Sequence, residues 1–328
     1  MEPIVERARE IAEEVLFPAA LDTDASDLLP RRNLDVLARG GLYGIAGPAE
    51  AGGLDLDLPT SYLVVEALAS GCLTTAFVWL QHRNPVRAVA ASSTPGLSDA
   101  WLAALCSGER RAGIALAGNR PGGAILRARN TSDGGLLLDG EAPWVSGWGL
   151  IDALLLTARD GDTVVSSLID AGPSPTLQAE RLRLVGANAS VTVTLRFQGH
   201  AVPAERIVGR EPHDAVLARD PTGLRMNGSL ALGLIDRCCR LIGPSALDDE
   251  LLTLRGALDE ASAGSLPVAR AWASDLAMRA ATALTVTQGS RSILIGQHAQ
   301  RLVREALFLM VFGSRAAIRQ DLLRRLTR

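Results

Sequence analysis

The stretch LLLDGEAPWVSGWGLIDALLLTAR, residues 136–159, decides which fold the chain is expected to adopt. Its two apolar runs, Leu136–Leu138 and Leu150–Thr157, each have the length of a β-strand. The segment between the runs is rich in turn-forming residues, namely Gly140, Pro143, Gly147 and Gly149. The stretch therefore predicts two strands joined by a turn-rich connection rather than by a helix.

Two tryptophans, Trp144 and Trp148, lie inside this connection. A tryptophan carries a large apolar face and one N–H group that needs a partner. On a loop between strands, such side chains either wall a pocket for a flat ligand or cap the end of a small β-barrel. The residues alone favour the cap.

The chain on either side of this region has helical patterns. Residues 4–16 form an amphipathic helical pattern, and residues 73–91 form a nearly continuous apolar helix that should be buried. From about residue 214 the chain is helical again, with Ser245 and Asp248 at the spacing of a capping box. The expected strands are residues 111–118, 124–129, 135–139, 150–158, 163–169 and 190–197.

Composition restricts the classes of function. The 328 residues are 48% hydrophobic, so the chain is long and apolar enough for two or three cores. A net charge of −3 does not favour nucleic-acid binding. Every basic residue is an arginine, which excludes a lysine Schiff base and a Walker-type phosphate loop.

The cysteines and the N-terminus point to a reducing compartment. No CxxC pair occurs, so we expect the cysteines to be reduced. No His, Cys or acidic residues have the spacing of metal ligands, so we expect no metal site. No basic region followed by an apolar core opens the chain, and residues 67–81 are too short an uncharged run to span a bilayer. We therefore expect a cytoplasmic protein that does not bind membranes.

Three motifs resemble acyl-CoA dehydrogenases. Asp139–Gly140 followed by Trp144 and Ser146 is similar to the family's "DG.K.W.(T/S)" strand end. Residues 40–53, GGLYGIAGPAEAGG, resemble its glycine-rich N-terminal loop, and residues 199–209, GHAVPAERIVG, resemble the exit from its β domain. The order helices, strands, helices is also that of the family, so the resemblance spans essentially the full length.

The resemblance implies an α+β fold with three parts. These are an all-helical domain at residues 1–110, a central β-barrel at 111–213 and a C-terminal four-helix bundle at 214–328. Such bundles pair across subunits, so a homodimer, a homotetramer or a hetero-oligomer with a related subunit is expected.

The resemblance also implies a cofactor and a substrate. Family members remove a proton next to a thioester and pass a hydride to FAD, so the implied substrate is an acyl-CoA or another small molecule. Trp144 and Ser146 match the residues that lie against the flavin ring. Arg255, Gln288 and Gly289 match further FAD contacts by position. The family's flavin loop is replaced here by residues 117–123, AGNRPGG.

One departure from the family concerns the catalytic base. The family's glutamate follows a helix start that matches residues 301–306, and its position falls on Phe312 or Gly313. Neither residue accepts a proton, and residues 306–320 contain no carboxylate. The chain resembles a short, actinobacterial-type member that lacks the usual catalytic glutamate.

Three explanations of this departure remain open. A base is supplied from elsewhere, with Glu66, Glu141 and Asp152 as carboxylates of unassigned role. Alternatively, the chain is a non-catalytic subunit of a hetero-oligomer, as in some steroid-degrading relatives. In the third explanation, the chain is a reduced-flavin monooxygenase of the same fold that uses FAD or FMN. His82 would then be the catalytic residue beside the peroxide. The alternative for His82 is a structural role at the end of a helix.

Overall fold

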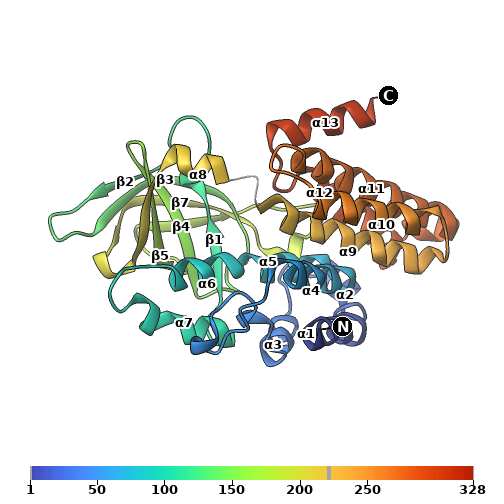
Figure 1. Ribbon diagram of the computed structural model, residues 1–328, viewed down its shortest axis with the longest axis horizontal. Helices are drawn as coiled ribbons and strands as arrows, with labels where there is room; N and C mark the ends of the chain where they lie inside the picture. Colours follow the sequence, from blue (N-terminus) through green and yellow to red (C-terminus); the bar gives the residue numbers. More distant parts are fainter. Residues whose placement is uncertain (1, 220–222, 328) are drawn as a thin grey trace.

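The computed structural model describes residues 2–219 and 223–327, and it places a group of strands between two sets of helices (Figure 1). The N-terminal helices are α1 (Pro3–Ile11), α2 (Ala20–Ala25), α3 (Arg31–Arg39), α4 (Leu58–Gly71), α5 (Leu73–Gln81), α6 (Arg83–Ala90) and α7 (Leu97–Ser107). The strands are β1 (Ala112–Ala115), β2 (Leu126–Asn130), β3 (Leu136–Val145), β4 (Ala153–Asp160), β5 (Thr163–Asp170), β6 (Leu177–Arg181), β7 (Val193–Val202) and β8 (Ile207–Pro212). The C-terminal helices are α8 (His213–Arg219), α9 (Leu224–Ile242), α10 (Ala246–Asp259), α11 (Leu266–Gln288), α12 (His298–Val311) and α13 (Ala316–Leu326).

All eight described strands belong to one sheet. Their order is β6-β7-β3-β2-β4-β5-β8, with β1 paired to β4 on a side branch. Most neighbours are antiparallel, and β1 and β2 pair with β4 in parallel. The inward faces of these strands share an apolar core of their own, to which Leu138, Leu154 and Leu195 contribute fully buried side chains.

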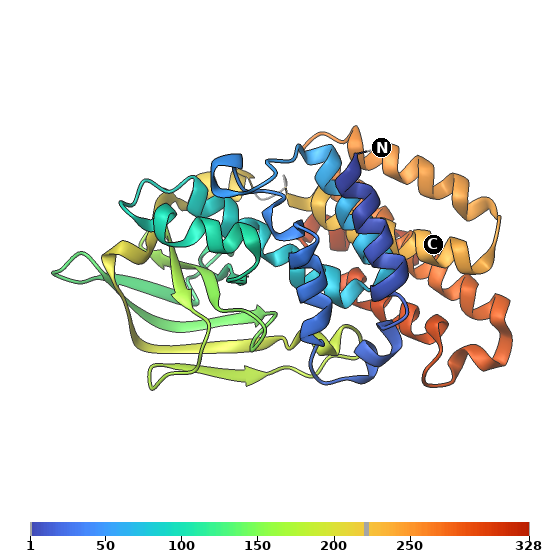
Figure 2. The same cartoon turned by 90° about the horizontal axis from the view of Figure 1, so that it is seen from below.

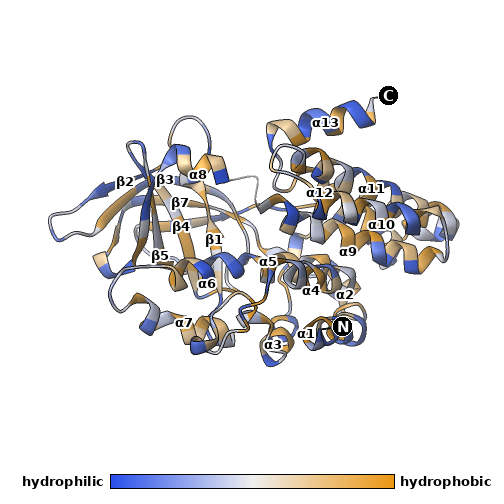
Figure 3. Ribbon diagram, in the orientation of Figure 1, coloured by the Kyte–Doolittle hydropathy of each residue, from blue (hydrophilic) through white to orange (hydrophobic). Residues whose placement is uncertain are grey.

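Helices α1 to α5 and α9 to α13 share one core, whereas α6 and α7 pack on the sheet in a cluster that includes Val89, Leu102 and Leu155. One continuous cluster of buried residues includes Val5 of α1, Leu68 of α4, Leu234 of α9 and Leu322 of α13. Figure 2 shows helices α1 to α5 packed along the C-terminal helices, with the strands and the α6–α7 segment at the other end of the molecule. Figure 3 shows apolar residues on the strands and on the helices of this core, whereas much of α13 is hydrophilic. The two helical domains predicted at residues 1–110 and 214–328 therefore both contribute to this core.

Local sequence signals explain where several helices begin. The Asp57 carboxylate accepts a hydrogen bond from the Thr60 N–H at 2.8 Å and caps α4. The capping box of Ser245 and Asp248 is present at the start of α10. Both caps satisfy backbone N–H groups that a helix leaves unpaired at its first turn.

Several elements differ from the expectation. Strand β3 continues through Trp144 to Val145, because β7 pairs with it beyond the turn-forming glycine at 140. The long apolar helix is divided at His82 into α5 and α6. Two short strands, β6 and β8, lack a clear alternating pattern and were not predicted.

Three further observations concern the cysteines, membrane spans and metal sites. All four cysteines are unbonded and buried. Within the described residues, no helix is both long and apolar enough to cross a bilayer. In the same residues, no three His, Cys, Asp or Glu side chains lie close enough together to hold a metal ion.

Candidate functional site

Trp144 lies at an irregular point of β3. The register between β3 and β7 shifts between Ala142 and Val145, which is the signature of a β-bulge. Trp144 has φ +65°, a left-handed conformation that bulky residues rarely adopt. Its side chain is 65% exposed, although Ala142 and Val145 on either side are buried. The bulge therefore turns a large apolar ring outward at a cost in backbone strain, a combination that marks functional sites.

Ser146, two residues further on, faces the opposite way. Its hydroxyl is buried and lies 2.7 Å from the hydroxyl of Thr192, which in turn lies 2.9 Å from that of Ser190. The backbone N–H of Gly147 donates to the Ser190 carbonyl at 2.7 Å. This chain of three hydroxyls fastens the end of β3 to the short turn η5 (Asn188–Ser190).

The end of β3 also meets helix α5. Gly147 has φ +87°, and a Cβ atom there would lie 3.5 Å from a methyl group of Val78. The preceding residue on α5, Phe77, packs its ring 5.0 Å from the rings of both Phe308 and Phe312. Helix α5 thus connects the Trp144 segment with the C-terminal end of α12.

The positions matched to the family's glutamate are apolar in the structure. Phe312 follows the last residue of α12 and stacks on Phe308 at 5.3 Å, so its ring is part of an aromatic cluster with Phe77. Gly313 has φ +62°, and a Cβ atom there would lie 3.1 Å from the Asn227 amide nitrogen. No proton acceptor takes the place of the glutamate on this segment.

The three unassigned carboxylates each have partners elsewhere. Glu66 pairs with Arg255 at 3.0 Å and with Arg225 at 3.4 Å. Glu141 pairs with Arg196 at the surface, and Asp152 accepts the backbone N–H of Arg111 at 2.8 Å. Burial raises the pKa of Glu66, and the two arginines oppose that rise. None of these carboxylates belongs to the aromatic cluster.

His82 is held in the interior by both ring nitrogens. Its Nδ1 accepts the backbone N–H of Ala112 at 2.9 Å, and its Nε2 donates to the Leu105 carbonyl at 3.0 Å. The ring also packs edge-on against Tyr43. Burial lowers the pKa of His82 to about 4. These contacts join α5 and α7 to β1 and leave no ring nitrogen for a peroxide, so the structure favours the structural role.

The other predicted cofactor residues lie on separate elements. Arg255 is in the second half of α10, and its guanidinium is turned toward Glu66 of α4. Gln288 ends α11, and Gly289 follows it with φ +70°; both are exposed. Neither they nor Arg255 contributes to the aromatic cluster. Of the predicted set, only Trp144 and Ser146 are neighbours, because they lie two residues apart at the end of β3.

The loop matched to the family's flavin loop approaches β4 closely. A Cβ atom at Gly118 would lie 2.8 Å from the backbone of Ala158, so only glycine fits there. The Gly118 N–H donates to the Thr157 hydroxyl at 3.1 Å. The side-chain oxygen of Asn119 is buried and has no partner. The loop thus offers one unpaired acceptor to a ligand.

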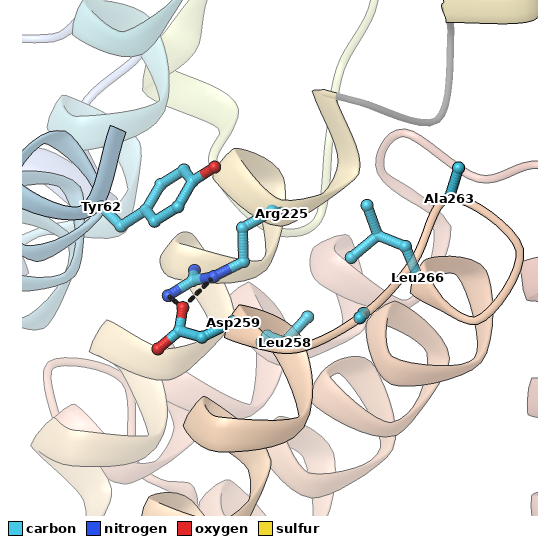
Figure 4. Close-up of a pocket in the computed structure, with 7 residues that line it drawn as sticks. Tyr62, Arg225, Leu258, Asp259, Ala263 and Leu266 are labelled. Carbon is cyan, nitrogen blue, oxygen red and sulfur yellow. Dashed lines mark hydrogen bonds and ion pairs between the residues drawn. The ribbon is translucent and has the colours of Figure 1, made fainter. Parts of the chain in front are cut away.

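A pocket that sequence reasoning missed lies between α4, α9 and the start of α11 (Figure 4). Its volume is about 220 Å³, and its polar wall is formed by Tyr62, Arg225 and Asp259. The Arg225 guanidinium lies 4.1 Å from the centre of the Tyr62 ring and 2.6 Å from the Asp259 carboxylate. The sequence showed a lone arginine at the start of a helix there, with no spacing that joined it to Tyr62.

Comparisons with known proteins agree on one family. Residues 2–109 match the model of the acyl-CoA dehydrogenase N-terminal domain. Cyclohex-1-ene-1-carbonyl-CoA dehydrogenase of Geobacter metallireducens is 24% identical over 63% of this chain and 57% of its own length. The matching part of the chain spans about half the length of the curated relatives.

Solved structures extend the similarity of fold to the whole chain. Butyryl-CoA dehydrogenase from Megasphaera elsdenii is 18% identical with a TM-score of 0.83, over 99% of this chain and 97% of that one. A glutaryl-CoA dehydrogenase from Mycobacterium smegmatis in complex with FADH2 is 15% identical with a TM-score of 0.83, over 99% of this chain and 93% of that one. With its helical N-terminal part, central sheet and C-terminal helices, the chain has the fold of the acyl-CoA dehydrogenases, and residues 2–109 match the N-terminal domain of that family.

Proposed function

We propose that the chain is a flavin-binding subunit of an acyl-CoA dehydrogenase-type oxidoreductase, and that the base for the substrate comes from a related partner subunit. The acyl thioester and the hetero-oligomer are both part of this proposal. One observation carries it: the position matched to the base is occupied by Phe312, whose ring is packed against Phe77 and Phe308.

The residues around Trp144 fit a flavin. The exposed indole offers a flat apolar face, and the loop matched to the family's flavin loop holds a buried Asn119 oxygen without a partner. The hydroxyl chain from Ser146 to Ser190 holds the strand end that carries Trp144. FAD, when bound, supplies a hydride acceptor; the protein's part is to bind and orient it. The solved relative with FADH2 supports FAD as the cofactor.

The aromatic cluster excludes proton transfer from the Phe312 position. A general base has to be within hydrogen-bond reach of the proton that it removes. Phe312 and its neighbours supply apolar surface only, and the carboxylates of Glu66, Glu141 and Asp152 are engaged with arginine or backbone groups. A partner subunit that retains its own glutamate would complete the reaction.

Exposed apolar residues mark where a partner would bind. Ile295 is 96% exposed and Ile293 is 72% exposed, on the segment that follows α11. Val286 at the end of α11 is also largely exposed. Clusters of this kind on a soluble surface usually mark an interface with another protein. These exposed residues support the proposal of an oligomer. Measuring the mass of the protein in solution would distinguish a homodimer, a homotetramer and a hetero-oligomer.

The reduced-flavin monooxygenase receives no support from His82, because both of its ring nitrogens are bonded inside the protein. We therefore do not carry this alternative, or FMN, further.

Flavin retention tests the first half of the proposal. The visible absorbance of the protein is measured after incubation with FAD and gel filtration, for the wild type and for Trp144→Ala. We expect the wild type to retain FAD and Trp144→Ala to lose it. Trp148→Phe is the matched control, because Trp148 packs against the core of the sheet. Equal retention by the wild type and Trp144→Ala would contradict the assigned flavin site.

A further inference from the structure

A second cavity, of about 390 Å³, lies between the end of β5, the loop that follows it and the end of β7. At this end of the sheet Val202 of β7 pairs with Leu136 of β3. At the other end Val193 pairs with Val145, the neighbour of Trp144. A strand rises about 3.3 Å per residue, so roughly 25 Å of β3 separate the cavity from Trp144. The cavity is therefore distinct from the candidate flavin site.

Arg206 lines this cavity and carries an unused hydrogen-bond donor. It ends the short helix η6 (Ala204–Arg206). Its Nη2 donates to the Asp170 carboxylate at 2.9 Å, whereas its Nη1 is buried and has no hydrogen-bond partner among the described residues. The guanidinium also lies over the Trp101 ring, 4.4 Å from the ring centre. A buried N–H group without an acceptor costs free energy, and an oxygen atom of a ligand would remove that cost.

His200 supplies a second donor to the same cavity. Its Nδ1 lies 2.9 Å from the Thr176 hydroxyl, and its Nε2 forms no hydrogen bond within the part of the chain that the structure describes. Burial lowers the pKa of His200, and the charge of Asp170 opposes this shift. The ring is therefore neutral near pH 7, and its Nε2 carries the proton when the Thr176 hydroxyl donates to Nδ1.

The rest of the cavity wall indicates the body and the charge of a ligand. Besides Arg206, His200, Asp170 and Ser174, the wall is mostly formed by apolar side chains, among them Ile169, Pro173, Val202 and Pro203. The Arg206 charge is already balanced by Asp170, so a second negative charge on a ligand would be repelled by that carboxylate without compensation. A ligand with an apolar body and a single negative charge fits this wall best.

The segment that carries Arg206 is fixed in place by the loop between α6 and α7. The Thr94 hydroxyl donates to the Ile207 carbonyl at 2.5 Å, and the Ser92 hydroxyl donates to the Val208 carbonyl at 2.7 Å. These two bonds hold the chain directly after η6. A ligand would thus meet donors that are already ordered, which reduces the entropy lost on binding.

We propose that this cavity is a binding site for a small organic monocarboxylate. The carboxylate would accept hydrogen bonds from the Arg206 Nη1 and the His200 Nε2, and the apolar body would lie against the aliphatic wall. Guanidinium groups bind carboxylates through charge-assisted hydrogen bonds of well-defined geometry. The cavity volume lies at the lower end of the usual range for small-molecule sites, which favours a small acid. The site is independent of the flavin and of the proposed function.

Calorimetric titration with benzoate and hexanoate tests the site, with benzamide as the uncharged analogue of benzoate. The variants are Arg206→Gln and His200→Gln. The matched control is Arg196→Gln, an exposed arginine of β7 that pairs with Glu141 and Glu180 and does not line the cavity. We expect each cavity variant to bind the two acids about tenfold more weakly, as the loss of one charge-assisted hydrogen bond implies, and the control to bind them as the wild type does. Benzamide should bind the wild type at least tenfold more weakly than benzoate.

Histidine signals in a proton–carbon correlation NMR spectrum locate the bound acid. The chain has four histidines, and we expect benzoate to shift strongly the one signal that is missing from His200→Gln. Trp144→Ala should bind benzoate as the wild type does, because Trp144 is at the other end of β3. Loss of binding in Trp144→Ala would place the acid at the flavin site and would overturn the proposal.

Three further results would also overturn it. These are the absence of binding of both acids to the wild type at millimolar concentration, unchanged affinity in the cavity variants, and binding of benzamide or inorganic phosphate as tight as that of benzoate. Circular dichroism shows whether each variant is folded. If Arg206→Gln does not fold, because its contacts with Asp170 and Trp101 are lost, His200→Gln decides, since it removes no ion pair.

Discussion

The ring of Phe312 lies 5.0 Å from the ring of Phe77, with an angle of 76° between their planes. This edge-to-face contact joins the last turn of α12 to α5, and thereby joins two segments far apart in the chain. Edge-to-face pairs of this kind contribute roughly 0.5–1.5 kcal/mol beyond the burial of their area. The position matched to a catalytic base therefore serves packing in this protein.

Truncation of Phe77 should show how much this packing contributes. Phe77 is 4% exposed, so Phe77→Ala should lower the free energy of unfolding by about 3 kcal/mol or more, because it removes a buried ring and leaves a cavity. Phe77→Leu retains most of the volume and should cost less than about 1.5 kcal/mol. Urea unfolding of both variants measures the difference. Equal and small losses would show that the cluster is loosely packed.

Trp144→Gly should separate binding from stability. Glycine adopts φ +65° without strain, and its greater freedom in the unfolded chain opposes that gain. We therefore expect the free energy of unfolding to change by less than about 1 kcal/mol while FAD retention is lost. A large loss of stability would mean that Trp144 is kept for packing rather than for a ligand.

His82 should make stability depend on pH. Burial lowers its pKa from 6.5 to about 4 in the folded state, so the unfolded state binds more protons between these values. The stabilisation is complete above pH 6.5 and is lost as the pH falls toward 4, a change of about 3 kcal/mol.

The measurement for His82 is urea unfolding between pH 4.5 and 7.5 in the wild type and in His82→Gln. Burial also lowers the pKa of His298 to about 4 and lowers the pKa of His200, so the wild-type slope has several contributions and the difference between the two proteins isolates His82. We expect the variant to have the shallower slope. Identical slopes would refute the burial of a neutral His82.

Arg255→Gln should affect stability and leave FAD retention unchanged. The Arg255 guanidinium pairs with Glu66, whose side chain is 9% exposed. Loss of Arg255 leaves this buried carboxylate with Arg225 as its remaining partner and should cost about 2 kcal/mol near pH 7.

The double variant Arg255→Gln, Glu66→Gln is the control, because it removes the buried negative charge as well. It should recover part of the stability that Arg255→Gln loses. If Arg255→Gln instead abolished FAD retention in a normally folded protein, the cofactor role expected from the sequence would stand.

The sequence was sufficient to predict the fold, because its motifs and the order of its helices and strands agreed. The Trp144–Ser146 motif, the glycine-rich loop at residues 40–53 and the order of elements all resembled one family. The sequence was not sufficient to predict the site. The bulge that exposes Trp144 depends on pairing with β7, some fifty residues further along the chain, and the partner of Arg255 is on α4.

Anaerobic titration of the FAD-loaded protein with an acyl-CoA tests the central claim most directly, because the flavin loses its visible absorbance when it accepts a hydride. We expect this chain alone to retain its absorbance, because Phe312 occupies the position of the base. The absorbance should be lost when a related subunit with its own glutamate is added. Loss of absorbance with this chain alone would show that it carries a complete active site and would contradict the account.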